Sequence, residues 1–153
     1  MKKLLIIAAL AAGVTGIQAQ PFAFQLSLTP NIAIHPKTAQ INGVSLDIWG
    51  ENPQHSFNLG FVNGSTGDSK GFSWAFFYNY AESYTGVQWA LVNHTTKSFV
   101  GWQDGWVNYD EGYFKGFESG LVNVASDAHG LQFGFIGRAV SQKSSANPIK
   151  TRH

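Results

Sequence analysis

The chain of 153 residues predicts an all-β protein, and three observations carry this prediction. A unit of eight residues, typified by GFESGLVN, recurs seven times between residues 43 and 137. Within each unit, large apolar residues alternate with polar or small ones, which is the period of a strand and not of a helix. Turn-forming residues separate the units. A fixed period of this kind indicates a repeat architecture.

Residues 1–19 have the pattern of a secretory signal peptide. Two lysines follow the initial methionine, and residues 4–14 form an apolar segment too short to remain in a bilayer. Ala19 supplies the small residue expected before a cleavage point at Gln20. We therefore expect an exported protein. The sequence contains no cysteine, which excludes a cysteine-linked lipid anchor, disulfides and thiol catalysis.

The charge of the chain does not match that of a nucleic-acid-binding protein. The sequence has 10 Lys and Arg residues against 9 Asp and Glu residues. Two of the lysines lie in the predicted signal peptide and four basic residues lie in residues 138–152, so residues 20–137 keep four lysines against all nine acids. An acidic body does not attract a phosphate backbone, and we expect no nucleic-acid partner.

The elements are expected in the following order. Residues 20–29 alternate apolar and polar side chains and predict a first strand. Two prolines within residues 30–36 predict a loop or a short extended segment, because proline cannot donate to a strand ladder. The repeats of residues 43–137 then add seven strands, which makes about eight in one all-β domain over residues 20–140. Residues 141–153 are rich in Ser, Lys and Asn and predict a disordered basic tail.

The repeat has a fixed internal pattern. Its units start at intervals of 13, 15, 15, 15, 15 and 14 residues. Positions two, four and six of a unit are mostly large and apolar, positions three and five are polar or small, and position seven is usually Val. Position eight is Asn in four units, where we interpret it as a turn former at a strand end. The units are GVSLDIWG, SFNLGFVN, GFSWAFFY, GVQWALVN, GWQDGWVN, GFESGLVN and GLQFGFIG, starting at Gly43, Ser56, Gly71, Gly86, Gly101, Gly116 and Gly130.

Two arrangements of the repeat are compatible with this pattern. We favour an antiparallel β-meander of about eight strands, with the option of closure into a small barrel. Large side chains would then lie opposite small ones, as a narrow curved interior requires, and the connectors would have ordinary hairpin lengths. The alternative is a β-solenoid with 13–15-residue coils, in which each Gly and Asn stacks on its own copies. Such a coil encloses little volume, whereas the candidate inward side chains include Trp74, Trp89, Trp102 and Trp106.

In a meander, the apolar band at positions two, four and six must be shielded from water. In an exported protein this band could face outer-membrane lipid, with the Gln, Gly and Val side chains inside. Asp104 opposes this reading, because it lies in the middle of the band, where an ionised group is costly in lipid. We expect Asp104 and Ser119, one repeat apart, to form a local polar spot. Outer-membrane lipid or another envelope component is the expected partner.

The repeat resembles the surface-repeat family of leptospires and other Gram-negative bacteria, whose members carry tandem units close to Gly-Leu-Gln-x-Gly-Leu-Val-Asn. The lead-in FQLSLTPNIAIHP is also similar, and the resemblance covers most of residues 24–137. It implies export and a surface location, and it brings no established reaction and no catalytic residue. This chain departs from the family in having few repeats and a polar segment after Phe135. The best-matching units start at Gly86, Gly101, Gly116 and Gly130.

Catalytic and metal-ligating residues do not converge in the sequence. Ser73 in GFSWA resembles a nucleophile elbow, but that motif needs a strand-to-helix turn and no helix is predicted. The histidines fall in separate segments and are expected to be solvated. Asp110 and Glu111, with Asp104 and Glu118 nearby, are expected to form a charged hairpin tip. We predict no enzymatic activity, no catalytic residue, no cofactor and no metal.

These features lead to two hypotheses about function. The first is an exported outer-membrane or surface repeat protein of structural or adhesive type. The alternative is a soluble periplasmic or secreted module that binds glycans or peptides with exposed aromatic side chains. In either case, the expected interaction surface consists of Trp102, Asp104, Tyr109, Asp110, Glu111 and Tyr113.

Overall fold

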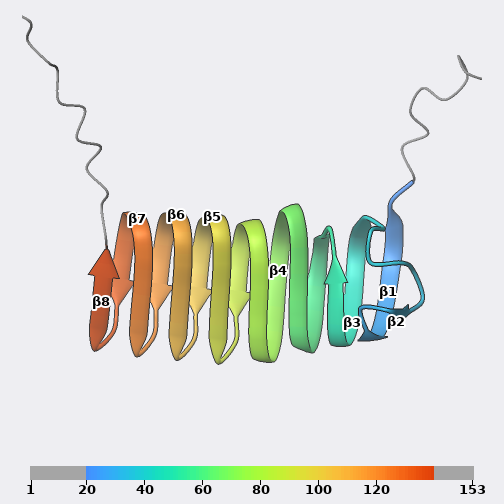
Figure 1. Ribbon diagram of the computed structural model, residues 1–153, viewed down its shortest axis with the longest axis horizontal. Helices are drawn as coiled ribbons and strands as arrows, with labels where there is room; N and C mark the ends of the chain where they lie inside the picture. The colour runs from blue at the N-terminus through green and yellow to red at the C-terminus, as the bar shows by residue number, and fades with distance from the viewer. Residues whose placement is uncertain (1–19, 140–153) are drawn as a thin grey trace, which may run out of the picture.

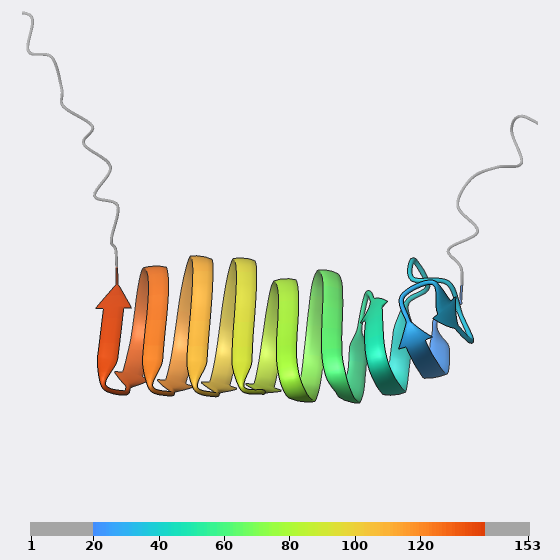
Figure 2. The same cartoon turned by 60° about the horizontal axis from the view of Figure 1, so that its bottom comes forward.

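Each repeat winds once around a common axis and stacks on the next, so that the chain forms a β-solenoid. The computed structural model describes residues 20–139, whose coils lie side by side along one axis (Figure 1). The turned view shows the same continuous stack, with the N-terminal loop at one end (Figure 2). The predicted signal peptide, residues 1–19, and the predicted tail, residues 141–153, lie outside the described residues.

The strands form one sheet in the order β2-β1-β3-β4-β5-β6-β7-β8. β4 is long because it continues through more than two coils without interruption. Within residues 20–139, β1 and β2 form the antiparallel pair and the other neighbours are parallel. The strands are β1 (Phe22–Thr29), β2 (Ile32–Ala33), β3 (Ile41–Asn52), β4 (His55–Trp89), β5 (Val92–Asp104), β6 (Val107–Ser119), β7 (Val122–Phe133) and β8 (Ile136–Ala139).

Neighbouring repeats pair residue for residue. Gly101 of β5 lies opposite Gly116 of β6, and Asn93 lies opposite Asn108. The prediction of an all-β tandem repeat is confirmed. The favoured antiparallel meander is wrong, and so is its closure into a small barrel, because the repeats run parallel in the alternative solenoid arrangement.

The repeat unit is not one strand, as the alternation predicted. In GVQWALVN, β4 ends at Trp89 and β5 begins at Val92, so a sharp corner falls at positions five and six. His94 and Thr95, which were expected in a connector, continue β5. The corner changes which side of the chain points inwards, and Asn93 at position eight is fully buried.

The sequence argued against a solenoid because a coil is too narrow to enclose the tryptophans. The structure removes this objection, because the tryptophans lie outside the coil. Trp89 and Trp106 are 50% and 63% exposed. The interior instead receives the smaller or polar side chains of positions three, five and eight, such as Gln88, Ala90 and Asn93. These side chains suit a narrow coil, and most of them find a hydrogen-bond partner in the next coil.

Three asparagines of position eight form an internal ladder with Asn79, which follows the unit at Gly71, and they are not turn formers at strand ends. Asn79 Nδ2 donates to Asn93 Oδ1 at 3.0 Å, and the next two steps, to Asn108 and Asn123, are each 2.8 Å. Each amide also spans the corner of its own coil, as where Asn108 Nδ2 donates to the Ser119 carbonyl oxygen at 2.9 Å. Because both amide protons are used, burial of these polar groups is not costly.

Aromatic rings fill the wider part of the interior. Tyr84, Phe99 and Phe114 are buried and stacked, with centroids 6.2 and 6.1 Å apart. Ala81 and Ala125 complete this small apolar cluster. Most of the other buried side chains are polar, so the solenoid depends on regular hydrogen bonding more than on apolar packing.

The glycines that start the units let successive coils approach closely. Gly86, Gly101 and Gly116 have φ angles of 139°, 141° and 142°. A Cβ added to Gly101 would lie 1.9 Å from the carbonyl oxygen of Gly86. Only glycine fits such a position, because both the φ angle and the space exclude a side chain.

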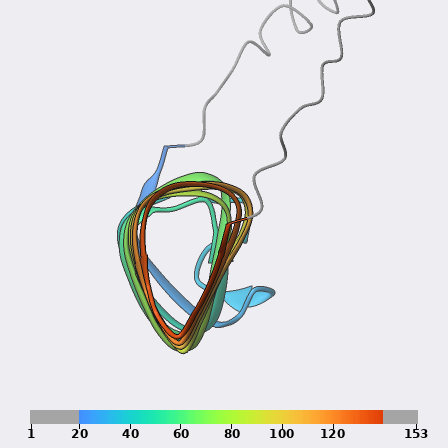
Figure 3. The same ribbon diagram turned by 90° about the vertical axis from the view of Figure 1, so that its left-hand side faces the viewer.

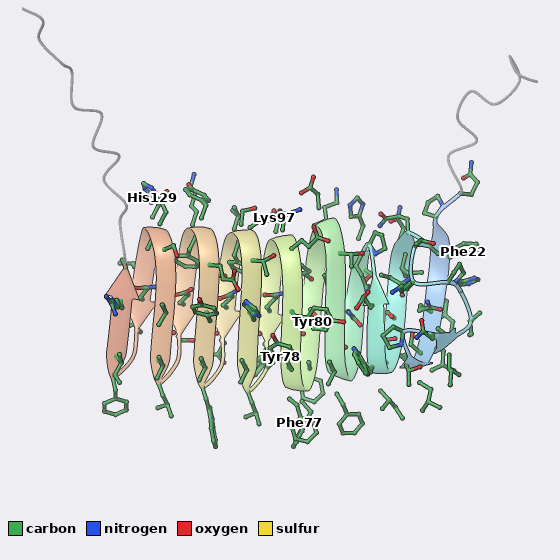
Figure 4. All side chains as sticks on the ribbon, in the orientation of Figure 1. Phe22, Phe77, Tyr78, Tyr80, Lys97 and His129 are labelled. Atoms are coloured by element: carbon green, nitrogen blue, oxygen red, sulfur yellow. The ribbon has the colours of Figure 1, made fainter. Side chains whose placement is uncertain are left out.

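The coil has two unlike ends in cross-section. Seen along the axis, it narrows to one corner and is broad on the opposite side (Figure 3). Side chains at the narrow corner, including Phe77, point away from the body, whereas Lys97 and His129 project from the broad side (Figure 4). The narrow corner is the one formed by positions five and six.

Candidate interaction surface

One side of the solenoid is an apolar face, made by positions two and four of successive coils. Parallel register places each of these positions in a straight row, so that Phe57 stacks on Phe72 with centroids 4.9 Å apart. The first row contains Phe24, Val44, Phe57, Phe72, Val87, Trp102, Phe117 and Leu131. The second row contains Leu26, Leu46, Leu59, Trp74, Trp89, Asp104, Ser119 and Phe133.

Asp104 and Ser119 are the two polar residues in these rows. Ser119 Oγ donates a short hydrogen bond to Asp104 Oδ1 in the neighbouring coil. The predicted polar spot is therefore present. It lies toward the C-terminal end of a face that is otherwise made of large apolar side chains.

The narrow corner carries a third row, the apolar edge, formed by position six and its neighbour Phe77. Backbone hydrogen bonds join the corners of successive coils: Trp106 N donates to Leu91 O and Leu121 N donates to Trp106 O, both at 2.9 Å. The edge is therefore as regular as the sheet. It consists of Leu28, Ile48, Phe61, Phe76, Phe77, Leu91, Trp106, Leu121 and Phe135.

A shallow groove lies between the apolar face and the apolar edge in the N-terminal half. Its volume is about 570 Å³, and its walls are almost entirely apolar. Its lining includes Leu46, Leu59, Phe61, Trp74 and Phe76. A second hollow lies farther along the same surface, between Trp74, Trp89 and Trp106.

The charged side chains gather on the broad side, which we call the charged edge. It includes Lys70, Glu82, Lys97, Glu111, Lys115, Asp127 and His129. Lys97 Nζ lies 2.6 Å from Glu82 Oε2, and His129 Nε2 lies 3.1 Å from Asp127 Oδ1. The hydrogen bond from Lys97 lowers the pKa of the exposed Glu82 carboxyl. The molecule is thus amphipathic across its axis.

The remaining side is a tyrosine face, formed by Trp49, Tyr78, Tyr80, His94 and Tyr109. Tyr80 lies over Gly64, where a Cβ would meet its ring at 2.4 Å, and its hydroxyl donates to Glu51 Oε2 at 2.7 Å. Burial raises the pKa of the Tyr80 hydroxyl, and its bond to Glu51 raises it further. Tyr78 Oη lies 2.8 Å from His94 Nδ1.

The interaction surface predicted from the sequence is not one surface. Trp102 and Asp104 lie on the apolar face and Tyr109 lies on the tyrosine face. Glu111 lies where the tyrosine face meets the charged edge, with its Oε1 2.7 Å from His94 Nε2. Tyr113 is half-buried, with its ring 5.3 Å from that of His129. The prediction fails because it treated a segment that encircles the coil as one hairpin.

Asp110 is inside the coil, and the predicted charged hairpin tip is therefore wrong. Asp110 and Glu118 are 1% and 0% exposed. Gln103 Nε2 donates to Asp110 Oδ1 at 3.3 Å, and Gln132 Nε2 donates to Glu118 Oε2 at 2.6 Å. Burial, then the hydrogen bond with Asp110, raises the pKa of Glu118 to about 9. Burial also raises the pKa of Asp110, so the pair holds a proton at neutral pH.

Known proteins offer no match. No protein-family model matches the chain, and neither do any curated protein or solved structure. The resemblance to the surface-repeat family stays a prediction. Within residues 20–139, no helix is long and apolar enough to cross a membrane. The same residues contain no group of three or more His, Cys, Asp or Glu side chains that could hold a metal ion.

Sequence reasoning missed the tyrosine face and the apolar edge. Both follow from the corner inside each repeat, which places position six and position seven on different sides. One feature of the sequence indicated a corner at this place. The unit at Gly71 has two residues, Phe76 and Phe77, where the other units have the single residue of position six. Asn79 nevertheless pairs with Asn93, so the additional residue is accommodated at the corner.

Proposed function

We propose that this protein is an exported envelope or surface repeat protein of structural or adhesive type, without catalytic activity. The observation that carries the proposal is the unbroken apolar surface, which runs from Leu28 to Phe135 along one edge of the solenoid. Exposed apolar patches larger than a few hundred Å² mark interaction sites in soluble proteins. A rigid repeat with such a surface suits attachment, not turnover.

Three polar groups that the sequence suggested for catalysis or for an acidic cluster support this proposal by their location. Ser73, the residue of the elbow-like motif, is buried and donates to Asn79 Oδ1 at 2.8 Å. Asp110 and Glu118 are sealed within the coil and cannot meet a substrate. These groups are members of the internal hydrogen-bond network.

Cell fractionation tests the proposal. Cells that produce the full chain are separated into soluble and envelope fractions in the absence of detergent. We expect the protein in the envelope fraction, with release by detergent but not by 1 M salt, because the attachment surface is apolar. A protein found wholly in the soluble fraction would contradict attachment.

The tyrosine face favours a second function, a module that binds glycans. Tyr78 and Tyr80 stack with centroids 5.6 Å apart, beside a shallow pocket of about 510 Å³ that Glu51 and His94 also line. Aromatic rings beside carboxylates and hydroxyls can hold a sugar ring. A titration of the protein with a panel of soluble glycans, followed by tryptophan fluorescence, tests this function. Trp49 reports binding because its Nε1 donates to Tyr80 Oη at 3.2 Å.

A further inference from the structure

We propose that the apolar edge inserts into the interface of a lipid bilayer, with the solenoid axis parallel to the membrane plane. The inference rests on the proposed attachment function and adds the partner and the orientation. It is carried by the shape of the edge, by the chemistry of the two faces beside it and by the position of one aspartate.

The edge has the shape needed to enter a leaflet along its whole length. It is the narrow, convex corner of every coil, and the hydrogen bonds between the corners of successive C-terminal coils keep it straight (Figures 3 and 4). Eight coils at the spacing of neighbouring strands extend over about 35 Å. Phe61, Trp106 and Phe135 are 50%, 63% and 90% exposed, so their side chains project beyond the backbone.

The order of side chains away from the edge matches the order of layers in a leaflet. Phe and Leu dominate the edge itself. On the two sides next to the edge, Trp74 and Trp89 lie on the apolar face, and Tyr80 and Tyr109 lie on the tyrosine face. Trp and Tyr are enriched where hydrocarbon meets headgroups. Most of the exposed charged residues then lie on the opposite edge, farthest from the membrane (Figure 4), whereas Glu51 and Arg138 lie on the tyrosine face.

Asp104 sets the depth of insertion. Trp102, Asp104 and Trp106 point outwards from one coil, with Trp106 on the edge and Trp102 two positions beyond Asp104. An ionised carboxylate is excluded from hydrocarbon but tolerated among headgroups. The chain turns at Gly105 and Trp106, so the Asp104 carboxylate lies at most about 7 Å from the edge, the length of two extended residues. This depth agrees with the roughly 5–10 Å that interfacial proteins bury.

The same features argue for lipid and against a second copy of the chain at this edge. A strip about 35 Å long and about 10 Å wide offers roughly 350 Å², well below the roughly 800 Å² per partner of a stable protein interface. A bilayer closes around both sides of a convex corner, whereas a rigid copy would need a matching groove. No Lys or Arg occurs at positions two, four or six, so the surface matches an uncharged phase and needs no anionic lipid.

Trp102 and Trp106 provide a matched pair for the test. The purified protein is mixed with neutral phosphatidylcholine vesicles, and its partition is measured by flotation for the native protein and for the variants Trp106→Ser and Trp102→Ser. We expect native binding that does not change between 0.05 and 0.5 M salt, a loss of at least tenfold for Trp106→Ser, and a loss below threefold for Trp102→Ser. Thr85→Asp, on the charged edge, serves as a control for surface charge.

Depth-dependent quenching gives a second readout that a folding defect would not imitate. Two variants keep a single tryptophan, at position 102 or 106, and phenylalanine replaces the other four. With lipids brominated on the acyl chain, we expect stronger quenching of Trp106 than of Trp102.

The outcomes separate this inference from the proposed function. If the native protein ignores the vesicles, the lipid partner is refuted, and an envelope location then stands with a protein partner. If both tryptophans are quenched equally, or both serine variants bind equally weakly, insertion by the edge is refuted. If the protein instead forms a concentration-dependent dimer through the apolar face, and vesicle binding is lost when the dimer forms, insertion by the edge is also refuted.

Discussion

The interior and the exterior of this solenoid carry the opposite chemistry from that of most folded domains. Gln88, Asn93 and Asn108 are fully buried, whereas Trp89 and Trp106 are at least half exposed. Amide side chains are mostly exposed in globular proteins because an interior rarely satisfies all their hydrogen bonds. Parallel stacking removes this difficulty for the asparagine ladder, since each of its amides meets an identical amide at a fixed spacing. Gln88 Nε2, by contrast, is buried without a hydrogen-bond partner. Regular repetition, more than polarity, decides which side chains are inside.

This difference divides the effects of mutation. Interior substitutions should break a periodic network and lower the free energy of unfolding. Exterior substitutions should leave that free energy almost unchanged and alter attachment. Four predictions test the division, beginning with the largest effect.

The largest effect is expected from Gly101→Val. The φ angle of 141° and a carbonyl oxygen 1.9 Å from the added Cβ force the coils apart. We expect a loss of about 4 kcal/mol or more in the free energy of unfolding, measured by urea denaturation. Gly67→Ala is the control, because Gly67 also has a positive φ, 61°, but no atom lies within 4 Å of its added Cβ. A loss of about 1 kcal/mol is expected there.

Asn108→Leu should have the next largest effect. It removes the acceptor of Asn93 and the donors to Asn123 and to the Ser119 carbonyl, all inside the coil. Buried groups left without partners cost about 2–4 kcal/mol together. Trp106→Ser is the matched exterior change and should alter stability by about 0.5 kcal/mol at most. Equal losses for the two variants would contradict the division.

Glu118→Gln should change the pH dependence of stability. The pKa of Glu118 is raised to about 9 in the folded protein, so the folded state binds more protons than the unfolded state from about pH 4.5 upwards. Stability therefore falls as the pH rises from 5 to 9, by at most about 1.4 kcal/mol per pH unit for one proton. Gln already occupies this position in neighbouring coils, so the variant should fit and reduce the slope.

Thermal or urea denaturation at a series of pH values measures that slope. Asp68→Asn is the control for the loss of an exposed carboxylate outside the coil. Asp110 remains buried in the Glu118→Gln variant, and some pH dependence from its raised pKa persists. An unchanged slope in Glu118→Gln would show that Glu118 is ionised inside the coil.

The smallest effect on stability is expected from Asp104→Leu. It loses the hydrogen bond from Ser119 on a half-exposed surface and should change the free energy of unfolding by about 0.5 kcal/mol at most. Asp104→Leu should strengthen membrane binding, whereas Trp106→Ser should weaken it, because leucine at position 104 extends the apolar surface farther from the edge. We expect severalfold tighter partition into neutral vesicles in the flotation assay. Weaker partition would contradict the depth assigned to Asp104.

Much of the local pattern could be predicted from the sequence. The alternation correctly placed positions two and four together on one side and positions three and five on the other, but it did not separate position six, which the corner moves to the apolar edge. It also predicted that Asp104 would lie beside Ser119, which requires only the repeat length. These features depend on local periodicity, and local periodicity is visible in one chain.

The direction of the repeats could not be obtained in the same way. Antiparallel and parallel stacking both satisfy the alternation, and the choice depended on assuming that large aromatic side chains are buried. Asn93, Asn108 and Asn123 contained the opposing signal, since an identical residue at each turn of a coil can form a ladder. The hairpin assumed for the meander misplaced Asp110, whose partners Gln103 of β5 and Glu118 of the same strand β6 reach it through the interior of the coil.

The residue-for-residue register also has a consequence for how this protein can vary. Each coil contacts only its neighbours, so a duplicated fifteen-residue segment lengthens the molecule without disturbing the coils already present. Each added copy extends the apolar edge by about 4.8 Å. If the edge attaches the protein as proposed, gain or loss of one unit would change the strength of attachment in small, equal steps.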